Sequence, residues 1–217
     1  MFRKTHLLVA AAVLALPALA LANVAVTVDP GQTWVGYMNV FDLPVGSGGF
    51  LWGSAWGTAD LPATFDGPEL TLAPNTNVYD PNDAYWVNPD GSGAKWMNAN
   101  MYVEPGVIGD TIDFSGLCVE NTFVADYTTD AFIKVLDPAQ GWITILEVYA
   151  PIVDGQPFSL SLEVPNTAGL VSQYGFQTNG ADANPATVDA LGHVVVVPEP
   201  SSLGLLALSA VALIRRR

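Results

Sequence analysis

The sequence predicts an all-β protein whose main domain is an antiparallel two-sheet sandwich of the jelly-roll type. Apolar and polar residues alternate with a period of two in several stretches, most clearly from Phe158 to Val164. Turn sequences that combine Pro, Gly, Asp and Asn separate these stretches, and no internal stretch shows a convincing helical period. Short strands without helices between them favour two packed sheets.

Twelve short segments are candidates for the strands of this sandwich. In chain order they cover residues 24–28, 33–41, 49–56, 69–72, 84–87, 95–103, 111–123, 131–135, 142–149, 158–164, 171–178 and 193–197. Within 111–123 the apolar parity changes after Phe114, and Gly116 stands at the change. We therefore expect a β-bulge at Ser115 and Gly116.

Residues 1–22 have the features of a secretory signal peptide. A positively charged start precedes an apolar run over residues 7–16, and Ala20 and Ala22 match the small-x-small rule for cleavage. We therefore expect an N-terminal signal helix, cleavage after Ala22, and a mature chain that begins at Asn23.

The last 20 residues, 198–217, form a second distinctive segment. Pro198 and Pro200 lack backbone donors and end the preceding strand. The apolar run 203–214 then favours a hydrophobic helix, which at roughly 21 Å is shorter than a hydrocarbon core of about 30 Å. The chain ends with Arg215, Arg216 and Arg217. The positive-inside rule places these arginines in the cytoplasm and the main domain outside, whereas a buried C-terminal helix would leave them without partners.

This tail resembles the PEP-CTERM sorting signal of exported bacterial proteins, which is the substrate of an exosortase. Pro198, Glu199 and Pro200 match its motif, the run 203–214 matches its helix, and the final arginines match its basic end. The resemblance covers 20 of the 217 residues. It implies membrane retention through the C-terminal helix, processing near the motif, and delivery to the cell surface or to extracellular polymer.

The main domain, residues 23–197, is strongly acidic. It has 20 acidic and two basic side chains, a formal charge of −18, because five of the seven Lys and Arg residues lie in the terminal segments. A domain with this charge repels phosphates and anionic lipid, so nucleic acid is excluded as a partner. Solubility explains the acidity most simply, and cation sites are the alternative.

The residue types needed for common catalytic sites are scarce. Cys118 is the only cysteine, so we expect a small buried residue and no internal disulfide. His193 is the only histidine after the signal peptide, which excludes a zinc site built on imidazoles and argues against a Ser-His-Asp site. We therefore expect no enzymatic activity. A glycoside hydrolase with paired carboxylates is the alternative, since the domain contains Glu69, Glu104, Glu120, Glu147 and Glu163.

Two pairs of tryptophans have different expected roles. Trp52 and Trp56 lie on one side of a predicted strand, where we expect them to be core residues.

Trp86 and Trp96 differ, because they flank a polar loop that contains Asn88 and Asp90. Flat aromatic rings stack on the apolar faces of sugars, so we expect these four residues to bind a ligand. The alternative is that the two tryptophans close the end of the sandwich.

A calcium site is a further hypothesis. Asp80, Asn82 and Asp83 could offer the oxygen ligands that calcium prefers. Their spacing does not match an EF-hand, and turn formation beside a proline also explains Asx residues.

Together these features predict an exported, tail-anchored, non-catalytic surface or matrix protein that associates with carbohydrate or exopolysaccharide. A structural or adhesive cell-envelope protein, stabilised by calcium, is the alternative of a different class. A hydrolase is the third.

Overall fold

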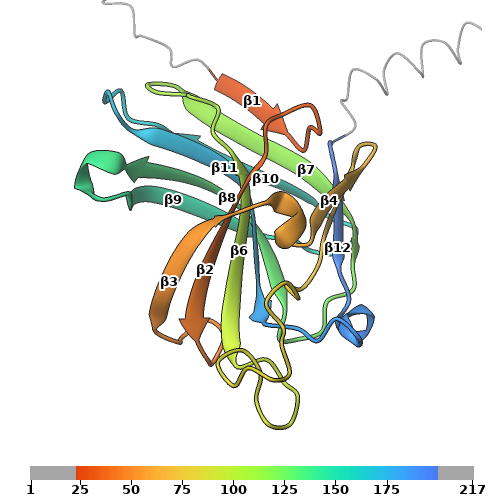
Figure 1. Cartoon of the computed structure of the whole chain (residues 1–217). Helices are drawn as coiled ribbons and strands as arrows, with labels where there is room; N and C mark the ends of the chain where they lie inside the picture. The colour runs from red at the N-terminus through yellow and green to blue at the C-terminus, as the bar shows by residue number, and fades with distance from the viewer. Residues whose placement is uncertain (1–22, 200–217) are drawn as a thin grey trace, which may run out of the picture.

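Two six-stranded sheets pack face to face in the computed structural model, which describes residues 23–199 (Figure 1). This arrangement confirms the predicted sandwich. Three short 3-10 turns interrupt the strands in this range: η1 (Thr58–Asp60), η2 (Pro138–Gln140) and η3 (Val188–Leu191). The predicted signal helix with Ala20 and Ala22, the hydrophobic helix, Pro200 and the final arginines lie outside the described residues.

Sheet A is built around β7 (Thr111–Asn121). Its other strands are β1 (Asn23–Thr27), β4 (Ala63–Asp66), β5 (Glu69–Leu72), β10 (Pro157–Glu163) and β12 (Val194–Val197). β10, β12 and β5 form antiparallel pairs, but β1 runs parallel to β7. The expectation of a wholly antiparallel sandwich is therefore wrong for β1. A parallel pair needs a long connection between its strands, and the chain between β1 and β7 is long enough to provide one.

Sheet B carries the candidate site. Its strands lie in the order β3-β2-β6-β11-β8-β9, and every neighbouring pair is antiparallel. The strands are β2 (Val35–Asp42), β3 (Phe50–Trp56), β6 (Lys95–Val103), β8 (Thr128–Asp137), β9 (Ile143–Pro151) and β11 (Val171–Ala181).

Two short segments differ from the predicted strands. Residues 84–86 form a turn, in which the amides of Trp86 and Val87 donate to the carbonyl of Asp83. Val87 makes only an isolated antiparallel bridge, with Gly93. Conversely, the unpredicted β4 pairs with β5 through a turn at Gly67, whose φ of 55° suits glycine. The last residues of β4, Phe65 and Asp66, run directly into Gly67 and Pro68, and this sequence is typical of a turn rather than of a strand.

The predicted bulge at Ser115 and Gly116 is wrong. Pairing between β7 and β10 continues without a break through both residues. Gly116 keeps the inward parity of Phe114 and is buried. The ring of Phe158 fills the space that a side chain at Gly116 would need, which explains the glycine at this position. The irregularity lies further along, where neighbouring residues of β12 pair with Cys118 and Glu120 and skip Val119.

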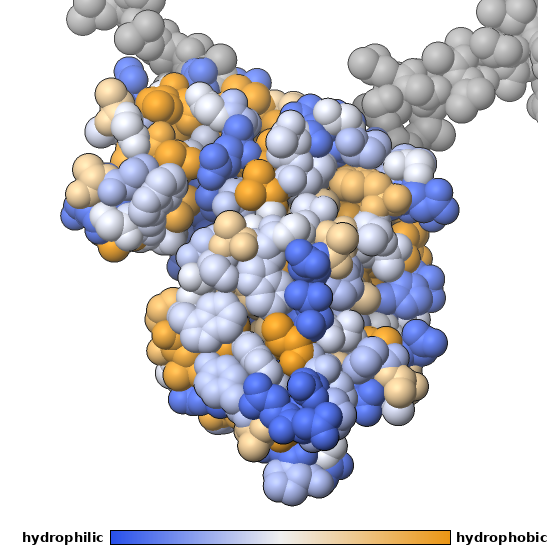
Figure 2. All heavy atoms as spheres, viewed as in Figure 1, coloured by the Kyte–Doolittle hydropathy of each residue, from blue (hydrophilic) through white to orange (hydrophobic). Residues whose placement is uncertain are grey.

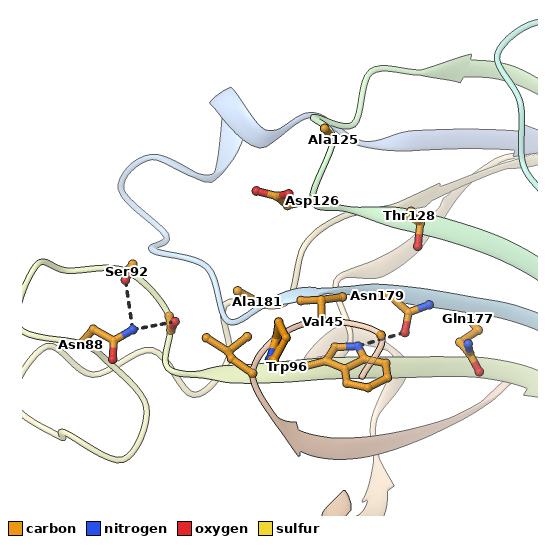
Figure 3. A pocket seen from close by; sticks show the side chains of 14 residues that line it. Val45, Asn88, Ser92, Trp96, Ala125, Asp126, Thr128, Gln177, Asn179 and Ala181 are labelled. Carbon is orange, nitrogen blue, oxygen red and sulfur yellow. Dashed lines mark hydrogen bonds between the residues drawn. The ribbon is translucent and has the colours of Figure 1, made fainter. Parts of the chain in front are cut away.

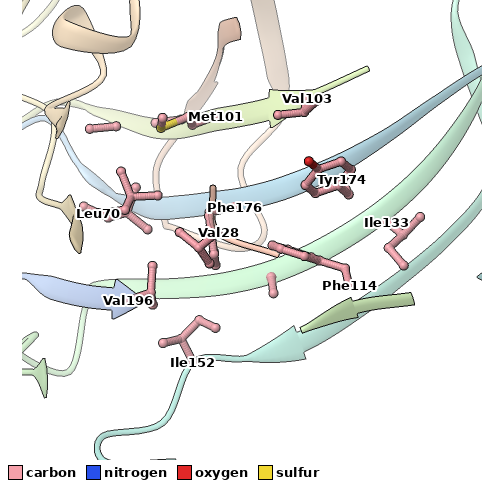
Figure 4. Packing of buried hydrophobic residues seen from close by; sticks show 14 of the residues in the cluster. Val28, Leu70, Met101, Val103, Phe114, Ile133, Ile152, Tyr174, Phe176 and Val196 are labelled. Atoms are coloured by element: carbon pink, nitrogen blue, oxygen red, sulfur yellow. The ribbon is translucent and has the colours of Figure 1, made fainter. Parts of the chain in front are cut away.

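The core lies between the sheets and is rich in aromatic residues (Figure 4). The ring of Phe114 from sheet A lies 4.9 Å from that of Tyr174 and 5.5 Å from that of Phe176, both on β11. Burial of each such side chain contributes roughly 1.5–3 kcal/mol. Cys118 is free and fully buried, as predicted.

Trp52 and Trp56 face the core side of sheet B, because they pair with the inward-facing Val40 and Gly36. Both are partly buried and pack against the core, which agrees with the expectation that they are core residues.

Candidate functional site

The outer face of sheet B, away from sheet A, has an unusual composition. Strand alternation places amides, aromatic rings and charged groups there: Tyr37, Asn39, Phe41, Trp96, Asn98, Asn100, Tyr102, Asp130, Phe132, Lys134, Glu147, Tyr149, Gln173, Gln177 and Asn179. Asn98, Asn100 and Asn179 are at most 8% exposed although they lie outside the core.

Five of these residues, Asn39, Asn98, Asn100, Gln177 and Asn179, form what we call the amide ladder. Asn98 is its centre: its Nδ2 donates to Asn179 Oδ1 at 2.6 Å. Its Oδ1 accepts from Asn100 Nδ2 at 2.8 Å and from Asn39 Nδ2 at 3.1 Å. The ladder thus connects β2, β6 and β11 through side chains as well as through the backbone.

Two groups that only donate fix the orientation of the ladder. The indole Nε1 of Trp96 donates to Asn179 Oδ1 at 3.1 Å. Lys134 Nζ donates to Asn100 Oδ1 at 3.0 Å and to Gln177 Oε1 at 3.3 Å. Because neither donor can accept, the amide atoms that face them must be oxygens. The oxygen and nitrogen positions that Trp96 requires in Asn179 and Asn98 are consistent with those that Lys134 requires in Asn100.

Lys134 lies against aromatic rings. Its Nζ is 4.1 Å from the ring centroid of Phe132 and 5.4 Å from that of Tyr149. Burial lowers the pKa of Lys134 to about 8, and the nearby negative charge of Glu147 partly opposes this shift. The ammonium makes no ion pair within 4.0 Å among residues 23–199. Neutral amide oxygens therefore solvate it.

Trp96 is held flat. Its ring stacks on Phe41 with centroids 4.2 Å apart and planes inclined by 26°. Together with the bond to Asn179, this stacking fixes both the tilt and the position of the indole.

A pocket of about 830 Å³ opens beside Trp96 (Figure 3). Trp96, Asn179, Gln177 and Ala181 line it from sheet B. Thr128, the first residue of β8, also belongs to this wall. Three loops supply the other walls: residues 43–46 between β2 and β3, the loop with Asn88, Ser92 and Gly93 before β6, and residues 125–126 before β8. Its size is in the range of pockets that hold small ligands.

Of the four predicted ligand residues, two line the pocket and two do not. Trp96 and Asn88 line the pocket. Asn88 Nδ2 also shapes the wall, since it donates to Ser92 Oγ and to the Gly93 carbonyl, both at 3.1 Å. Asp90 is exposed outside the pocket, where its carboxylate accepts from the amide and hydroxyl of Ser92. These bonds lower the pKa of Asp90.

Trp86 also lies outside the pocket lining. Its ring meets Trp52 and Tyr85 edge to face, with centroids 6.1 Å and 4.8 Å away. It is partly buried and packs against the core.

The predicted calcium ligands cap turns. Asp80 Oδ1 accepts from the backbone amide of Asn82 at 2.9 Å, and Asp83 Oδ1 accepts from that of Tyr85 at 2.8 Å. Residues 23–199 contain no group of three His, Cys, Asp or Glu that could hold a metal ion. Hydrophilic residues gather at the lower end of the molecule in Figure 2, near this part of the chain. Calcium binding stays a prediction.

Sequence reasoning missed the amide ladder and Lys134. A signal was present in β6, where Trp96, Asn98, Asn100 and Tyr102 alternate with Met and Ala residues. Such alternation places amides on the face opposite the core.

The comparisons with known proteins support the interpretation of the tail. Residues 196–217 match the PEP-CTERM protein-sorting motif. This match confirms the resemblance found in the sequence and implies an exported protein that an exosortase sorts. Among residues 23–199, no helix has the length and apolar character required to cross a membrane. No curated protein matches the chain.

Similar solved structures are distant. The enzymatically active domain of bacteriophage CBA120 tailspike protein 4 is 14% identical, with a TM-score of 0.38 over 76% of this chain and 18% of the tailspike chain. A CBM4 structure is 11% identical, with a TM-score of 0.26 over 64% of this chain and 80% of its own.

A third similar solved structure contains the CBM22-1 and GH10 modules of Clostridium thermocellum xylanase 10B in complex with xylohexaose. It is 12% identical, with a TM-score of 0.28 over 60% of this chain and 24% of its own. The chain spans about a fifth of the tailspike chain. None of these likenesses is close enough to assign a ligand or an activity.

Proposed function

We propose that the protein is a non-catalytic module of the cell surface or extracellular matrix that binds carbohydrate in the pocket beside Trp96. The observation that carries this proposal is the combination of a fixed indole with amides of fixed orientation. A sugar offers an apolar face for stacking and hydroxyl groups for hydrogen bonds. Preorganised side chains lower the entropy cost of binding such a ligand.

The sorting motif provides the setting for this activity. In the proposed arrangement the C-terminal helix holds the protein at the membrane, with the main domain outside the cytoplasm. Processing by an exosortase then delivers the domain to the surface or to extracellular polymer.

Affinity electrophoresis of the purified protein through gels that contain neutral, N-acetylated or acidic polysaccharides tests the proposal. We expect at least one polysaccharide to slow the protein, and Trp96→Ala to abolish most of that effect. Trp142→Ala is the matched control, since Trp142 is 56% exposed and lies outside the pocket. If no polysaccharide slows the protein, carbohydrate binding is excluded.

A structural or adhesive role is the second candidate, and the edge strand β9 favours it. Trp142, Ile143, Ile145 and Leu146 are each at least 37% exposed on or beside this strand, whose outer edge has no partner strand in sheet B. An exposed apolar edge is suited to self-association. Light scattering distinguishes the roles: concentration-dependent oligomers that Ile145→Lys disperses, without glycan binding, would support the structural role.

A further inference from the structure

One wall of the pocket presents hydrogen-bond donors. Asn179 Oδ1 is occupied by Trp96 Nε1 and Asn98 Nδ2, and Gln177 Oε1 is occupied by Lys134 Nζ. The nitrogens Asn179 Nδ2 and Gln177 Nε2 have no hydrogen-bond partner within residues 23–199, and both residues line the pocket. Figure 3 shows the Asn179 nitrogen on the side of the amide away from Trp96. This wall therefore suits a ligand oxygen that accepts hydrogen bonds.

The other walls present acceptors and apolar surface. Asn88 uses its nitrogen for the loop, which leaves Oδ1 as the atom free to accept from a ligand. Asp126 adds an exposed carboxylate to the same lining. Leu43, Val45 and Ala181 supply apolar contacts.

We propose that this pocket recognises the acetamido group of an N-acetylated sugar, an inference that rests on the proposed carbohydrate binding. An acetamido group has a carbonyl acceptor, an N–H donor and a methyl group. These match the amide nitrogens of β11, the acceptors at Asn88 and Asp126, and the apolar contacts, respectively.

Other sugar substituents fit less well. A carboxylate would meet Asp126 and the −18 charge of the main domain, and both repel it. A free ammonium group would be attracted by that charge, but it cannot accept from the amide nitrogens of Gln177 and Asn179. Lys134 does not line the pocket, so it acts as a positioning residue that turns the amide nitrogen of Gln177 toward the ligand.

Calorimetric titration of the full-length protein with four tetrasaccharides tests this specificity. The probes are β-1,4-linked tetramers of N-acetylglucosamine, glucosamine and glucose, together with a galacturonic acid tetramer. We expect the acetylated tetramer to bind at least tenfold more tightly than each of the others. Preference over the glucosamine tetramer cannot arise from the negative charge of the domain, because that charge favours glucosamine.

Isosteric variants test the two donors. Gln177→Glu and Asn179→Asp each replace an N–H donor by an acceptor of the same shape, and we expect each to weaken binding of the acetylated tetramer at least tenfold. Gln156→Glu adds the same charge at an exposed turn and should leave binding unchanged. Gln177 is less buried than Asn179, so its variant remains informative if Asn179→Asp destabilises the fold.

The outcomes separate this inference from the broader function. Equal binding of the N-acetylglucosamine and glucose tetramers, weakened by Trp96→Ala, would overturn acetamido recognition and leave carbohydrate binding intact. A preference for the galacturonic acid tetramer would overturn it in favour of a carboxylate. Absence of binding to every polysaccharide and tetramer would overturn both.

Discussion

Trp96 and Lys134 hold opposite ends of one hydrogen-bonded chain of side chains on the outer face of sheet B. The chain runs from Trp96 through Asn179, Asn98 and Asn100 to Lys134. Because both end groups only donate, the amides between them have a single consistent orientation. The orientation of the amides that line the pocket therefore depends on residues outside the lining, namely Asn98, Asn100 and Lys134.

Trp96→Phe separates the two roles of this tryptophan. Phenylalanine retains an aromatic ring that can stack on Phe41, but it removes the donor that fixes Asn179. We expect affinity for the bound glycan to fall about tenfold, while the free energy of unfolding changes by about 1 kcal/mol, the usual worth of one hydrogen bond. Titration and urea unfolding measure the two effects. An unchanged affinity would mean that the orientation of Asn179 is irrelevant to binding.

Lys134→Met tests the other end of the chain through its pH dependence. The pKa of Lys134 is lowered to about 8 in the folded protein, against an ordinary value of 10.5. Between these pH values the unfolded chain binds more protons, so this residue makes stability rise with pH. The variant should lack that rise in urea unfolding between pH 8 and pH 10. Lys95→Met, which breaks the ion pair with Asp42, should retain it.

The sequence predicted the fold better than the site. Alternation located β5, β6 and β10 to within a residue, because each has one face toward the core. The parallel pairing of β1 was missed, because a short strand such as Val24 to Val28 carries no information about its partner.

The site depends on contacts between residues far apart in the chain. Trp96 and Asn88 were found because they flank or lie in a polar loop, which is a local feature. Asn179 and Lys134 reach the same face from β11 and β8, and their meeting depends on strand order and register. Trp86 lies near Trp96 in sequence, yet its ring packs against Trp52.

Asp182→Asn should stabilise the protein at neutral and alkaline pH. Asp182 is 1% exposed, neither carboxylate oxygen has a hydrogen-bond partner in residues 23–199, and burial raises its pKa to about 7. The folded state therefore holds a proton that the unfolded state releases, so stability is lost as the pH rises from about 4 to about 7. The shift from 3.8 to about 7 corresponds to at most about 4 kcal/mol.

Urea unfolding of the protein and of Asp182→Asn at pH 4 and pH 8 measures this effect. We expect similar midpoints at pH 4 and a higher midpoint for the variant at pH 8. Asp66→Asn, beside the exposed turn between β4 and β5, controls for removal of one negative charge. Equal midpoints of the protein and Asp182→Asn at pH 8 would show that the buried carboxyl does not destabilise the fold.

Substitution of the sorting motif should change the mass of the mature protein. We expect the native protein to begin at Asn23, after cleavage of the signal peptide, and to lack residues 203–217 in the fraction released from the membrane. Pro198→Ala combined with Pro200→Ala removes the two prolines of the motif matched over residues 196–217 and should leave the tail attached. Intact-mass measurements on membrane and medium fractions check both expectations. A full-length tail in every fraction of the native protein would exclude release by processing, and unchanged processing of the double variant would exclude recognition through these prolines.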